Sequence, residues 1–305
     1  MNQNNIVKNI LENYCSDNPG TKTNIARILN SGVLKGTGKM VILPVDQGFE
    51  HGPNASFSLN PAAYDPEYHI QLAVEAGLNG YAAPLGMLEA VAGKYAGEIP
   101  LILKMNSANS LMPKEIPPTQ AITATIDDAL RLGCVAVGFT IYPGSSLAYD
   151  MIEQAAAMVS DAKAAGLAAI IWSYPRGEGI IDDCQTALDI TCYAAHIAAL
   201  IGAHIIKVKL PTQSIQNKNA IQQRCDFTEL KTRIEHVMQS AFANRRLVVF
   251  SGGATKNNEE ELYQEIKAIK TGGGNGSIIG RNVFQRDRAK ALLMLDKIKN
   301  IYLAG

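Results

Sequence analysis

Short apolar runs alternate with helical stretches along almost the whole chain. Eight runs have the length and continuous hydrophobicity of buried strands, at residues 41–45, 80–84, 101–105, 135–141, 168–174, 204–210, 247–250 and 277–280. Helical patterns separate most of them, for example at residues 145–165, 183–200, 227–243, 257–270 and 285–299. Glycines stand between a helical stretch and the next apolar run at Gly77, Gly133, Gly166 and Gly202. The pattern therefore predicts helices that alternate with the strands of a parallel sheet.

The number of units decides between two parallel-sheet folds. Eight units in 305 residues favour an α/β fold of the (β/α)8 type, the TIM barrel, over an open doubly wound sheet. Residues 1–39 lie outside the repeat and predict a helical N-terminal extension, and residues 106–120 predict a polar, proline-rich loop. Because no linker or low-complexity tract interrupts the chain, we expect residues 1–305 to form a single barrel domain, extension included.

Composition excludes several classes of protein. The formal net charge is +0, so no basic excess points to nucleic acid or to an anionic membrane surface. The five cysteines form no CxxC pair, and no run approaches the roughly 18 apolar residues of a membrane span. The N-terminus does not read as a secretion signal. We therefore expect a soluble protein of the reducing cytoplasm.

Two lysines within an otherwise apolar strand give the strongest chemical signal. Lys207 and Lys209 are two residues apart in the run at 204–210, so they share one face of the strand. Burying an ammonium is costly unless it is paired, neutralised or used. A desolvated lysine beside another cation loses its proton more readily and can then attack a carbonyl to form a Schiff base. The alternative is structural, with a side chain that reaches water at the strand end or pairs with a carboxylate.

Polar groups also follow the other predicted strands. The carboxyl ends of all strands of a barrel meet at one rim, where such enzymes hold their active sites. Glycines there let backbone N–H groups approach a phosphate, and an arginine adds a bidentate contact. The candidates, in chain order, are Asp46, Lys104, Trp172, Tyr174, Arg176, Ser251, Gly252, Gly253, Gly280 and Arg281.

Each of these candidates has a structural alternative. Asp46 suits a turn, Trp172 and Tyr174 suit barrel filling, and the segment from Ser251 to Gly253 suits a tight turn. The five histidines form no close ligand pair, so the sequence indicates no metal site. Convergence of a lysine, a phenol, a carboxylate and a phosphate cradle on one rim favours the catalytic interpretation.

Four sequence runs resemble a known family. They are residues 42–51 (ILPVDQGFEH), 137–145 (VGFTIYPGS), 202–209 (GAHIIKVK) and 251–254 (SGGA). In this order they resemble the class I fructose-bisphosphate aldolases of the archaeal and bacterial type, over nearly the whole chain from about residue 30. The resemblance implies that Lys207 is the Schiff-base lysine, Tyr174 the proton-transferring residue and Asp46 a catalytic aspartate.

The resemblance also implies a substrate site and a reaction. Trp172 matches a substrate-site tryptophan, and the glycine-rich ends with Arg281 match phosphate binding; we expect Lys104, Arg176 and Lys209 to contact the substrate as well, with Lys209 helping to keep Lys207 neutral. The implied reaction is reversible, metal-independent cleavage of fructose 1,6-bisphosphate into dihydroxyacetone phosphate and glyceraldehyde 3-phosphate, without a cofactor. A related lyase or transferase for another phosphorylated ketose, or a non-catalytic sugar-phosphate sensor, is the alternative. The resemblance further implies a homo-oligomer, possibly a decamer.

Overall fold

Eight parallel strands close into a barrel. The computed structural model describes residues 3–113, 115–217, 219, 226–252 and 258–304. Within them each barrel strand pairs with its neighbours in the order β1-β2-β3-β6-β7-β8-β9-β10, and β10 pairs with β1. The strands are β1 (Met40–Pro44), β2 (Gly80–Pro84), β3 (Leu101–Lys104), β6 (Ala136–Ile141), β7 (Ala168–Ser173), β8 (Ile205–Val208), β9 (Leu247–Ser251) and β10 (Gly276–Ile278). The barrel predicted from the sequence is confirmed, and each strand lies within its expected run or within a residue of it.

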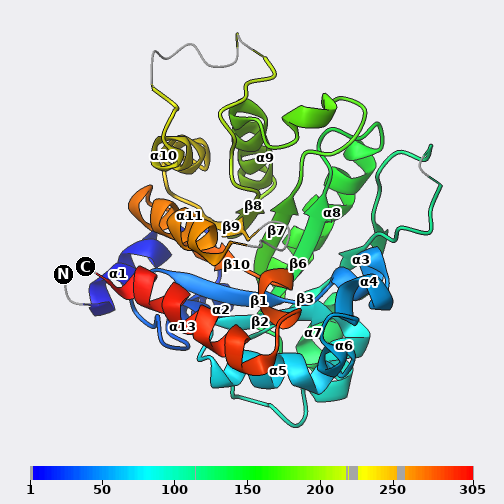
Figure 1. Ribbon diagram of the computed structural model, residues 1–305, viewed down its shortest axis with the longest axis vertical. Helices are drawn as coiled ribbons and strands as arrows, with labels where there is room; N and C mark the ends of the chain where they lie inside the picture. Colours follow the sequence, from blue (N-terminus) through cyan, green and yellow to red (C-terminus); the bar gives the residue numbers. More distant parts are fainter. Residues whose placement is uncertain (1–2, 114, 218, 220–225, 253–257, 305) are drawn as a thin grey trace.

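Helices surround the strands (Figure 1). The five helical stretches expected after residue 144 are confirmed, although the stretch expected at 183–200 becomes a helix only at Leu188, after a 3₁₀ turn. The helices are α1 (Gln3–Glu12), α2 (Pro19–Leu29), α3 (Gln47–His51), α4 (Pro53–Phe57), α5 (Pro66–Glu75), α6 (Leu85–Val91), α7 (Ile126–Arg131), α8 (Ala148–Ala164), α9 (Leu188–Leu200), α10 (Leu230–Ser240), α11 (Glu259–Thr271), α12 (Arg281–Phe284) and α13 (Arg288–Leu303), with 3₁₀ turns η1 (Pro61–Tyr64) and η2 (Asp182–Cys184).

The glycines between helices and strands have the conformation that the sequence predicts. Gly77, Gly133, Gly166 and Gly202 have φ angles of 60°, 68°, 77° and 93°. Residues with a side chain rarely adopt these angles, whereas glycine adopts them without steric cost. Each glycine therefore ends its helix within one residue and turns the chain directly into the next strand.

Alternation along each strand decides which side chains enter the barrel. On β8, Ile205 packs with the interior cluster, whereas Ile206 and Val208 pack with the helices outside. Lys207 therefore points into the barrel, on the same side as Ile205. It is only 4% exposed. Lys209 lies beyond the end of β8 and is half-buried, so the strand is shorter at this end than expected.

The N-terminal extension packs against the amino end of the barrel. Val7, Ile25 and Ile28 belong to the same buried cluster as Met40 and Ile205 inside the barrel. The helices α1 and α2 thus cover the end of the barrel opposite the strand carboxyl ends.

Polar contacts fix this extension to the barrel. The Tyr14 hydroxyl donates to the carbonyl oxygen of His204 at 2.7 Å and accepts from the amide of Leu247 at 3.2 Å. The amide of Ala169 donates to Nδ1 of His204, so the proton of that ring lies on Nε2, which donates to Asp17 at 3.1 Å. Lys163 also lies 3.6 Å from Asp17. The His204 side chain thereby joins the extension to β7 and β8.

The loop expected at residues 106–120 begins and ends in a small ribbon. The strands β4 (Asn106–Ser107) and β5 (Ala121–Ile122) pair antiparallel, with Ser107 opposite Ala121. Asn106 connects this ribbon to β6, because its amide donates to the carbonyl oxygen of Thr140 and its oxygen accepts from the Thr140 amide. The ribbon therefore lies over the carboxyl ends of β3 and β6.

The helices give no sign of a membrane span. In the part of the chain that the structure describes, none is long and apolar enough to cross a bilayer.

We predict that the hydroxyl of Tyr14 stabilises the extension against the barrel. Tyr14→Phe should lower the free energy of unfolding by about 1–2 kcal/mol, because it removes the partner of buried backbone groups. Tyr149→Phe is the matched control, since Tyr149 is 85% exposed, and it should change stability by less than about 0.5 kcal/mol. Urea denaturation measures both; equal effects of the two substitutions would contradict the assignment.

Candidate active site

A cavity of about 310 Å³ opens at the carboxyl ends of the strands. It has the size of a small-molecule site. Its wall is polar and contains both signs of charge. The lining residues are Pro44, Asp46, Gln47, Glu50, His51, Tyr174, Arg176, Lys207, Lys209, Ser251, Gly252, Ile278, Gly280 and Arg281.

A larger groove lies elsewhere and has different chemistry. Its volume is about 980 Å³, and it runs along α8 and α9, lined by apolar residues such as Ile152, Ile190 and Tyr193. No lysine or arginine is among its described lining residues. The smaller cavity at the strand ends is therefore the better site for an anionic ligand.

Lys207 is a strongly perturbed group of the barrel interior. Burial lowers its pKa to about 8; Asp46 opposes this shift, and Lys104 adds to it. Its Nζ lies 5.3 Å from the centre of the Trp172 ring and 5.6 Å from that of Tyr174. An amine with this pKa is neutral in a useful fraction of molecules near pH 7, as a nucleophilic lysine must be.

Lys104 is a second buried lysine next to the first. It is 3% exposed, and burial lowers its pKa to about 8 as well, against the opposing charges of Asp46 and Glu50. Its Nζ donates to the backbone carbonyl and the side-chain oxygen of Asn106, and it lies 5.7 Å from the centre of the Trp172 ring. The two amines therefore face the same indole from β3 and β8.

The structure corrects the role expected for Lys209. We expected Lys209 to be the neighbouring cation that keeps Lys207 neutral. The largest cationic effect on Lys207 is instead that of Lys104. Lys209 lines the cavity, where burial lowers its own pKa and Arg176 and Arg281 lower it further. It belongs with the charges that face the ligand.

Trp172 lies under the reactive end of Lys207, and a glycine makes room for it. Trp172 is 1% exposed, and the β7–β8 register pairs it directly with Lys207. A Cβ atom on Gly138 would lie 1.9 Å from Cζ3 of this indole. Gly138 on β6 therefore leaves the space that the indole occupies.

Tyr174, Arg176, Glu50 and Tyr142 form one wall. Burial raises the pKa of the Tyr174 phenol well above its usual value, and the charges of Asp46 and Glu50 act in the same direction. The guanidinium of Arg176 lies 5.3 Å from the Tyr142 ring and 5.8 Å from the Tyr174 ring, and it donates to Glu50 at 2.9 Å. Burial works to raise the pKa of Glu50, but Arg176 outweighs it and holds that pKa low. Tyr174 is thus a protonated phenol between fixed charges.

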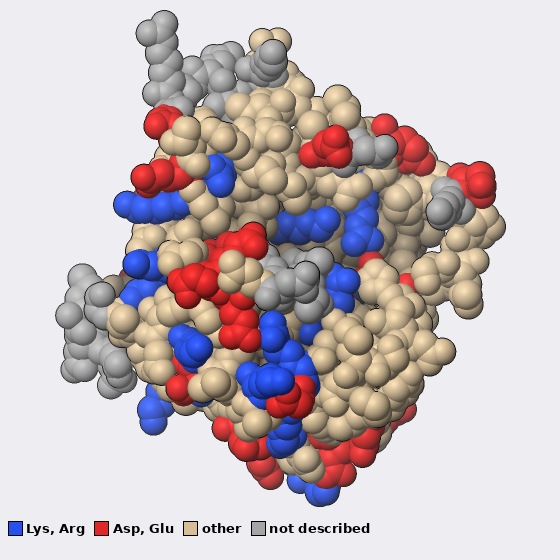
Figure 2. Space-filling model, in the orientation of Figure 1, with Lys and Arg blue, Asp and Glu red and all other residues tan. Residues whose placement is uncertain are grey.

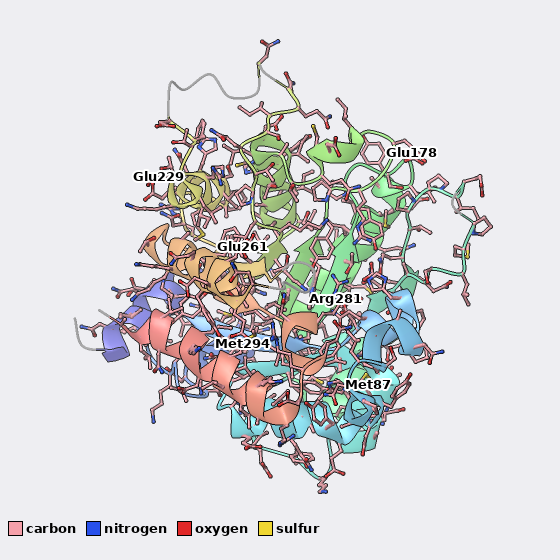
Figure 3. The ribbon with its side chains drawn as sticks, in the orientation of Figure 1. Met87, Glu178, Glu229, Glu261, Arg281 and Met294 are labelled. Atoms are coloured by element: carbon pink, nitrogen blue, oxygen red, sulfur yellow. The ribbon has the colours of Figure 1, made fainter. Side chains whose placement is uncertain are left out.

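The glycine-rich strand ends stand opposite this wall. A Cβ on Gly280 would lie 2.8 Å from the carbonyl oxygen of Pro44, so only glycine fits there. Arg281 follows at the start of α12 and is labelled near the middle of Figure 3. In Figure 2 basic side chains are prominent around the centre of the same face. This side of the cavity suits a phosphate.

The phosphate-binding role predicted for the glycines is only partly supported. The amide of Gly252 donates to the carbonyl oxygen of Ile278 at 3.2 Å, so it is not free for a phosphate as we expected. Gly253 lies outside the described residues. Ser251, Gly252 and Gly280 do line the cavity together with Arg281.

The structure brings most of the predicted site residues together. Asp46, Tyr174, Arg176, Lys207 and Lys209 line the cavity, while Lys104 and Trp172 lie behind Lys207. Four further polar residues in or next to the cavity were not predicted as site residues from the sequence. Gln47, Glu50 and His51 line it, and Tyr142 packs against Arg176, which also lines it. The first three follow Asp46 directly in α3, so the polar run after the first strand was the available signal.

The fold and this rim of charged groups define an enzyme of the (β/α)8 barrel class. The chain belongs to the DeoC/LacD family of aldolases, whose model matches residues 40–286. It is therefore an aldolase, a lyase, and its relatives are class I fructose-bisphosphate aldolases.

Individual relatives are similar over most of the chain. A probable class 1 fructose-bisphosphate aldolase of Chlamydia trachomatis is 34% identical over 293 residues, which cover 92% of this chain and 83% of the relative. The class 1 fructose-bisphosphate aldolase of Thermoproteus tenax is 35% identical over 249 residues, 82% of this chain and 84% of the relative. An archaeal fructose-1,6-bisphosphate aldolase, solved with its catalytic lysine covalently bound to a carbinolamine intermediate, matches with a TM-score of 0.76 and 31% identity, over 90% of this chain and 98% of that chain.

We predict that burial of Lys207 lowers the stability of the fold. Below pH 8 the lysine is protonated in both states, and a pKa lowered from 10.5 to about 8 corresponds to a cost of about 3 kcal/mol. Lys207→Met should raise the free energy of unfolding at pH 7 by about 2–3 kcal/mol.

The pH dependence gives this prediction its sign. Between pH 8 and 10.5 the unfolded chain holds a proton that folded Lys207 has lost, so the stability of the unsubstituted protein rises and the advantage of Lys207→Met shrinks. Urea denaturation from pH 7 to 10 measures this, with exposed Lys35→Met as the control that should change little. A constant difference across that range would contradict the lowered pKa.

We also predict that Gly138 positions Trp172. Gly138→Ala should displace the indole and cost about 1–3 kcal/mol through overpacking. Because Trp172 is the only tryptophan, its fluorescence reports the displacement directly. Gly93→Ala is the control, since a Cβ there meets nothing within 4 Å. An unchanged emission spectrum of Gly138→Ala would be inconsistent with the packing described above.

Proposed function

We propose that the protein cleaves fructose 1,6-bisphosphate reversibly into dihydroxyacetone phosphate and glyceraldehyde 3-phosphate through a Schiff base on Lys207. The observation that carries the proposal is a buried lysine with a pKa of about 8 at the open end of the barrel, in a cavity that also holds a carboxylate, a phenol and three cations. The names of the relatives support the substrate, and the covalent lysine complex of the archaeal structure supports the intermediate.

The first step needs a neutral amine. With a pKa of about 8, about one Lys207 in ten is neutral at pH 7, compared with fewer than one in a thousand for an ordinary lysine. The neutral amine attacks the ketone carbon, and loss of water gives an iminium. The iminium accepts the electron pair of the breaking carbon–carbon bond, so cleavage leaves an enamine instead of an unstabilised carbanion. This electron sink serves where other aldolases need a metal, so we assign neither a metal nor a cofactor to the reaction.

Proton transfer falls to the end of β7, the strand paired with the one that carries Lys207. Cleavage requires removal of the proton from the C4 hydroxyl, and we assign this to Tyr174. The negative charge of Asp46 acts on all three groups, because it raises the pKa of Lys207, of Lys104 and of Tyr174. It orients the substrate hydroxyls and keeps part of the lysine charge compensated.

The cations at the rim suit the phosphates. Arg176 and Arg281 both lower the pKa of Lys209, because their positive charges repel its ammonium. A phosphate dianion among them relieves this repulsion and adds charge-assisted hydrogen bonds. Binding at a phosphate also fixes the ketone against Lys207, which supplies orientation from a part of the substrate that does not react. Assembly as a homo-oligomer remains a prediction from the resemblance, and a cytoplasmic location remains a prediction from the composition and the cysteine pattern.

Borohydride trapping tests the proposal. Incubation with dihydroxyacetone phosphate followed by reduction should add the reduced ligand to the peptide that contains Lys207, because only an imine is captured in this way. Lys207→Ala should abolish the adduct. In Lys209→Ala and Lys104→Met the adduct should still form, and it should remain on Lys207. Peptide mass spectrometry measures the position.

Several outcomes would oppose the proposal. An adduct that persists in Lys207→Ala, or no adduct in the unsubstituted protein, would exclude Lys207 as the nucleophile. Loss of activity on treatment with EDTA would point to a metal-dependent aldolase. Adduct formation without cleavage of fructose 1,6-bisphosphate, but with cleavage of another phosphorylated ketose, would move the substrate and keep the chemistry.

A further inference from the structure

A second, much smaller cavity lies behind Tyr174. Its volume is about 20 Å³, and it shares Asp46, Glu50 and Tyr174 with the main cavity. The ribbon of β4 and β5 closes it from above. The remaining lining residues are Lys104, Ser107, Ala108, Gln120, Thr140 and Tyr142.

Two buried polar atoms at this cavity have no partner among the described residues. They are Oγ of Ser107 and Oε1 of Gln120. The two residues are 6% and 8% exposed. An unpaired buried polar atom costs about 1–3 kcal/mol, so two at one small cavity indicate a polar ligand between them.

The orientation of Gln120 is fixed from its other end. Its Nε2 donates to the Tyr142 hydroxyl at 2.6 Å. The two ends of an amide are assigned from such contacts, and exchanging them would place Nε2 where Oε1 stands. In either assignment one polar end of the amide remains for a ligand.

The volume restricts that ligand to water. A buried water needs about 10–15 Å³ and two to four polar partners, and this cavity supplies both. A sugar or a phosphate is far too large for it. Ser107 and Gln120 are brought together by the ribbon, where Ser107 is paired with Ala121, the residue after Gln120.

The chemistry of Tyr174 gives such a water a task. Because its pKa is raised, the phenol is protonated in the resting protein. A protonated phenol accepts the proton of a substrate hydroxyl only if it gives up its own at the same time. A proton acceptor must therefore lie within reach of the phenol. The small cavity is lined by both Tyr174 and Asp46, so a water in it can connect the phenol to the Asp46 carboxylate.

We propose that Ser107 and Gln120 hold one water molecule that relays a proton between Tyr174 and Asp46. The role of this water in the reaction rests on the proposed function, whereas the binding site does not. During cleavage the C4 hydroxyl proton moves to the phenol oxygen, the phenol proton moves to the water, and a water proton moves to the Asp46 carboxylate. The C4–O bond becomes a carbonyl as the electron pair of the C3–C4 bond passes to the iminium. Condensation reverses each transfer. Ser107 and Gln120 are positioning residues in this scheme.

A crystal structure of the unsubstituted protein at high resolution tests the site itself. It should show one ordered water within hydrogen-bond distance of Ser107 Oγ and the Gln120 amide, and within reach of the Tyr174 hydroxyl. A cavity without an ordered water would overturn the inference. If that cavity is empty but the Lys207 adduct still forms, the water site is wrong and the proposed function stands. If the water is present and no adduct forms, the proposed function is wrong and the water site stands.

Kinetics test the relay. Ser107→Ala and Gln120→Leu should lower kcat for cleavage by about 10- to 100-fold, with KM within about twofold and the Lys207 adduct unchanged. This is at or below the low end of the range for groups that transfer the proton themselves, because the two side chains act only through the water. The dependence of kcat on the fraction of D2O should be curved in the unsubstituted protein, because several protons move together, and linear in both variants. Tyr174→Phe should share the loss of kcat and the retained adduct.

Ser173→Ala is the matched control. Ser173 is buried, its hydroxyl has no partner in the described part of the chain, and it precedes Tyr174, but it does not line this cavity. This variant should retain both kcat and the curved dependence. Unchanged kcat in folded Ser107→Ala, or a linear dependence in the unsubstituted protein, would overturn the relay. If Gln120→Leu melts at a lower temperature, Ser107→Ala, which loses only a hydroxyl, still decides the question.

Discussion

The cost of burying two amines inside the barrel is the constraint on which the rest of the site depends. Lys207 and Lys104 are each less than 5% exposed, and burial is the largest cause of the lowered pKa of both. A buried charge without compensation destabilises a fold strongly. Asp46, with a smaller contribution from Glu50, offsets this cost for both lysines, and it does so incompletely, so the amines remain easy to deprotonate. A stronger ion pair would make Lys207 a better structural residue and a worse nucleophile.

The architecture keeps this cost at one end of the barrel. Below the lysines the interior is filled by Trp172, Ile170 and Ile205, and α1 and α2 pack against the amino end. The cavity that Lys207 lines opens at the carboxyl ends of the strands, away from these helices. The unfavourable charges therefore face this opening, where a ligand can compensate them. The Tyr14 and His204 contacts stabilise the apolar end. They thereby offset part of the free-energy cost of the buried charges at the polar end.

The sequence was sufficient for the fold because each unit carries its own signal. Continuous apolar runs with glycine at the helix ends specify eight strands whatever their partners are, and the register then places Lys207 beside Trp172. The site was predictable where it depends on position along a strand, as for Asp46, Tyr174 and Lys207. It was not predictable where it depends on which strands face each other across the barrel. Lys104 and Lys207 are 103 positions apart, so no local pattern shows that Lys104, and not Lys209, is the cation that acts most on Lys207. Glu50 lies in the polar run after β1, which is a local signal, but its pairing with Arg176, 126 positions away, could not be predicted from the sequence.

The two groups of cations then have different tasks, and their environments explain why. Lys104 is held by Asn106 behind the reacting amine, where it has no direct access to a bulky ligand and acts through its charge. Lys209, Arg176 and Arg281 line the open cavity, where an anion can approach them. A phosphate bound at the rim also favours the protonated form of any nearby amine, and would by itself return Lys207 towards its charged state. Lys104 works against that change from the opposite side. The inner cation therefore allows the outer cations to bind an anion without loss of the neutral nucleophile. This division of roles requires lysines on β3 and β8, two strands that are distant in sequence and that the barrel fold brings together.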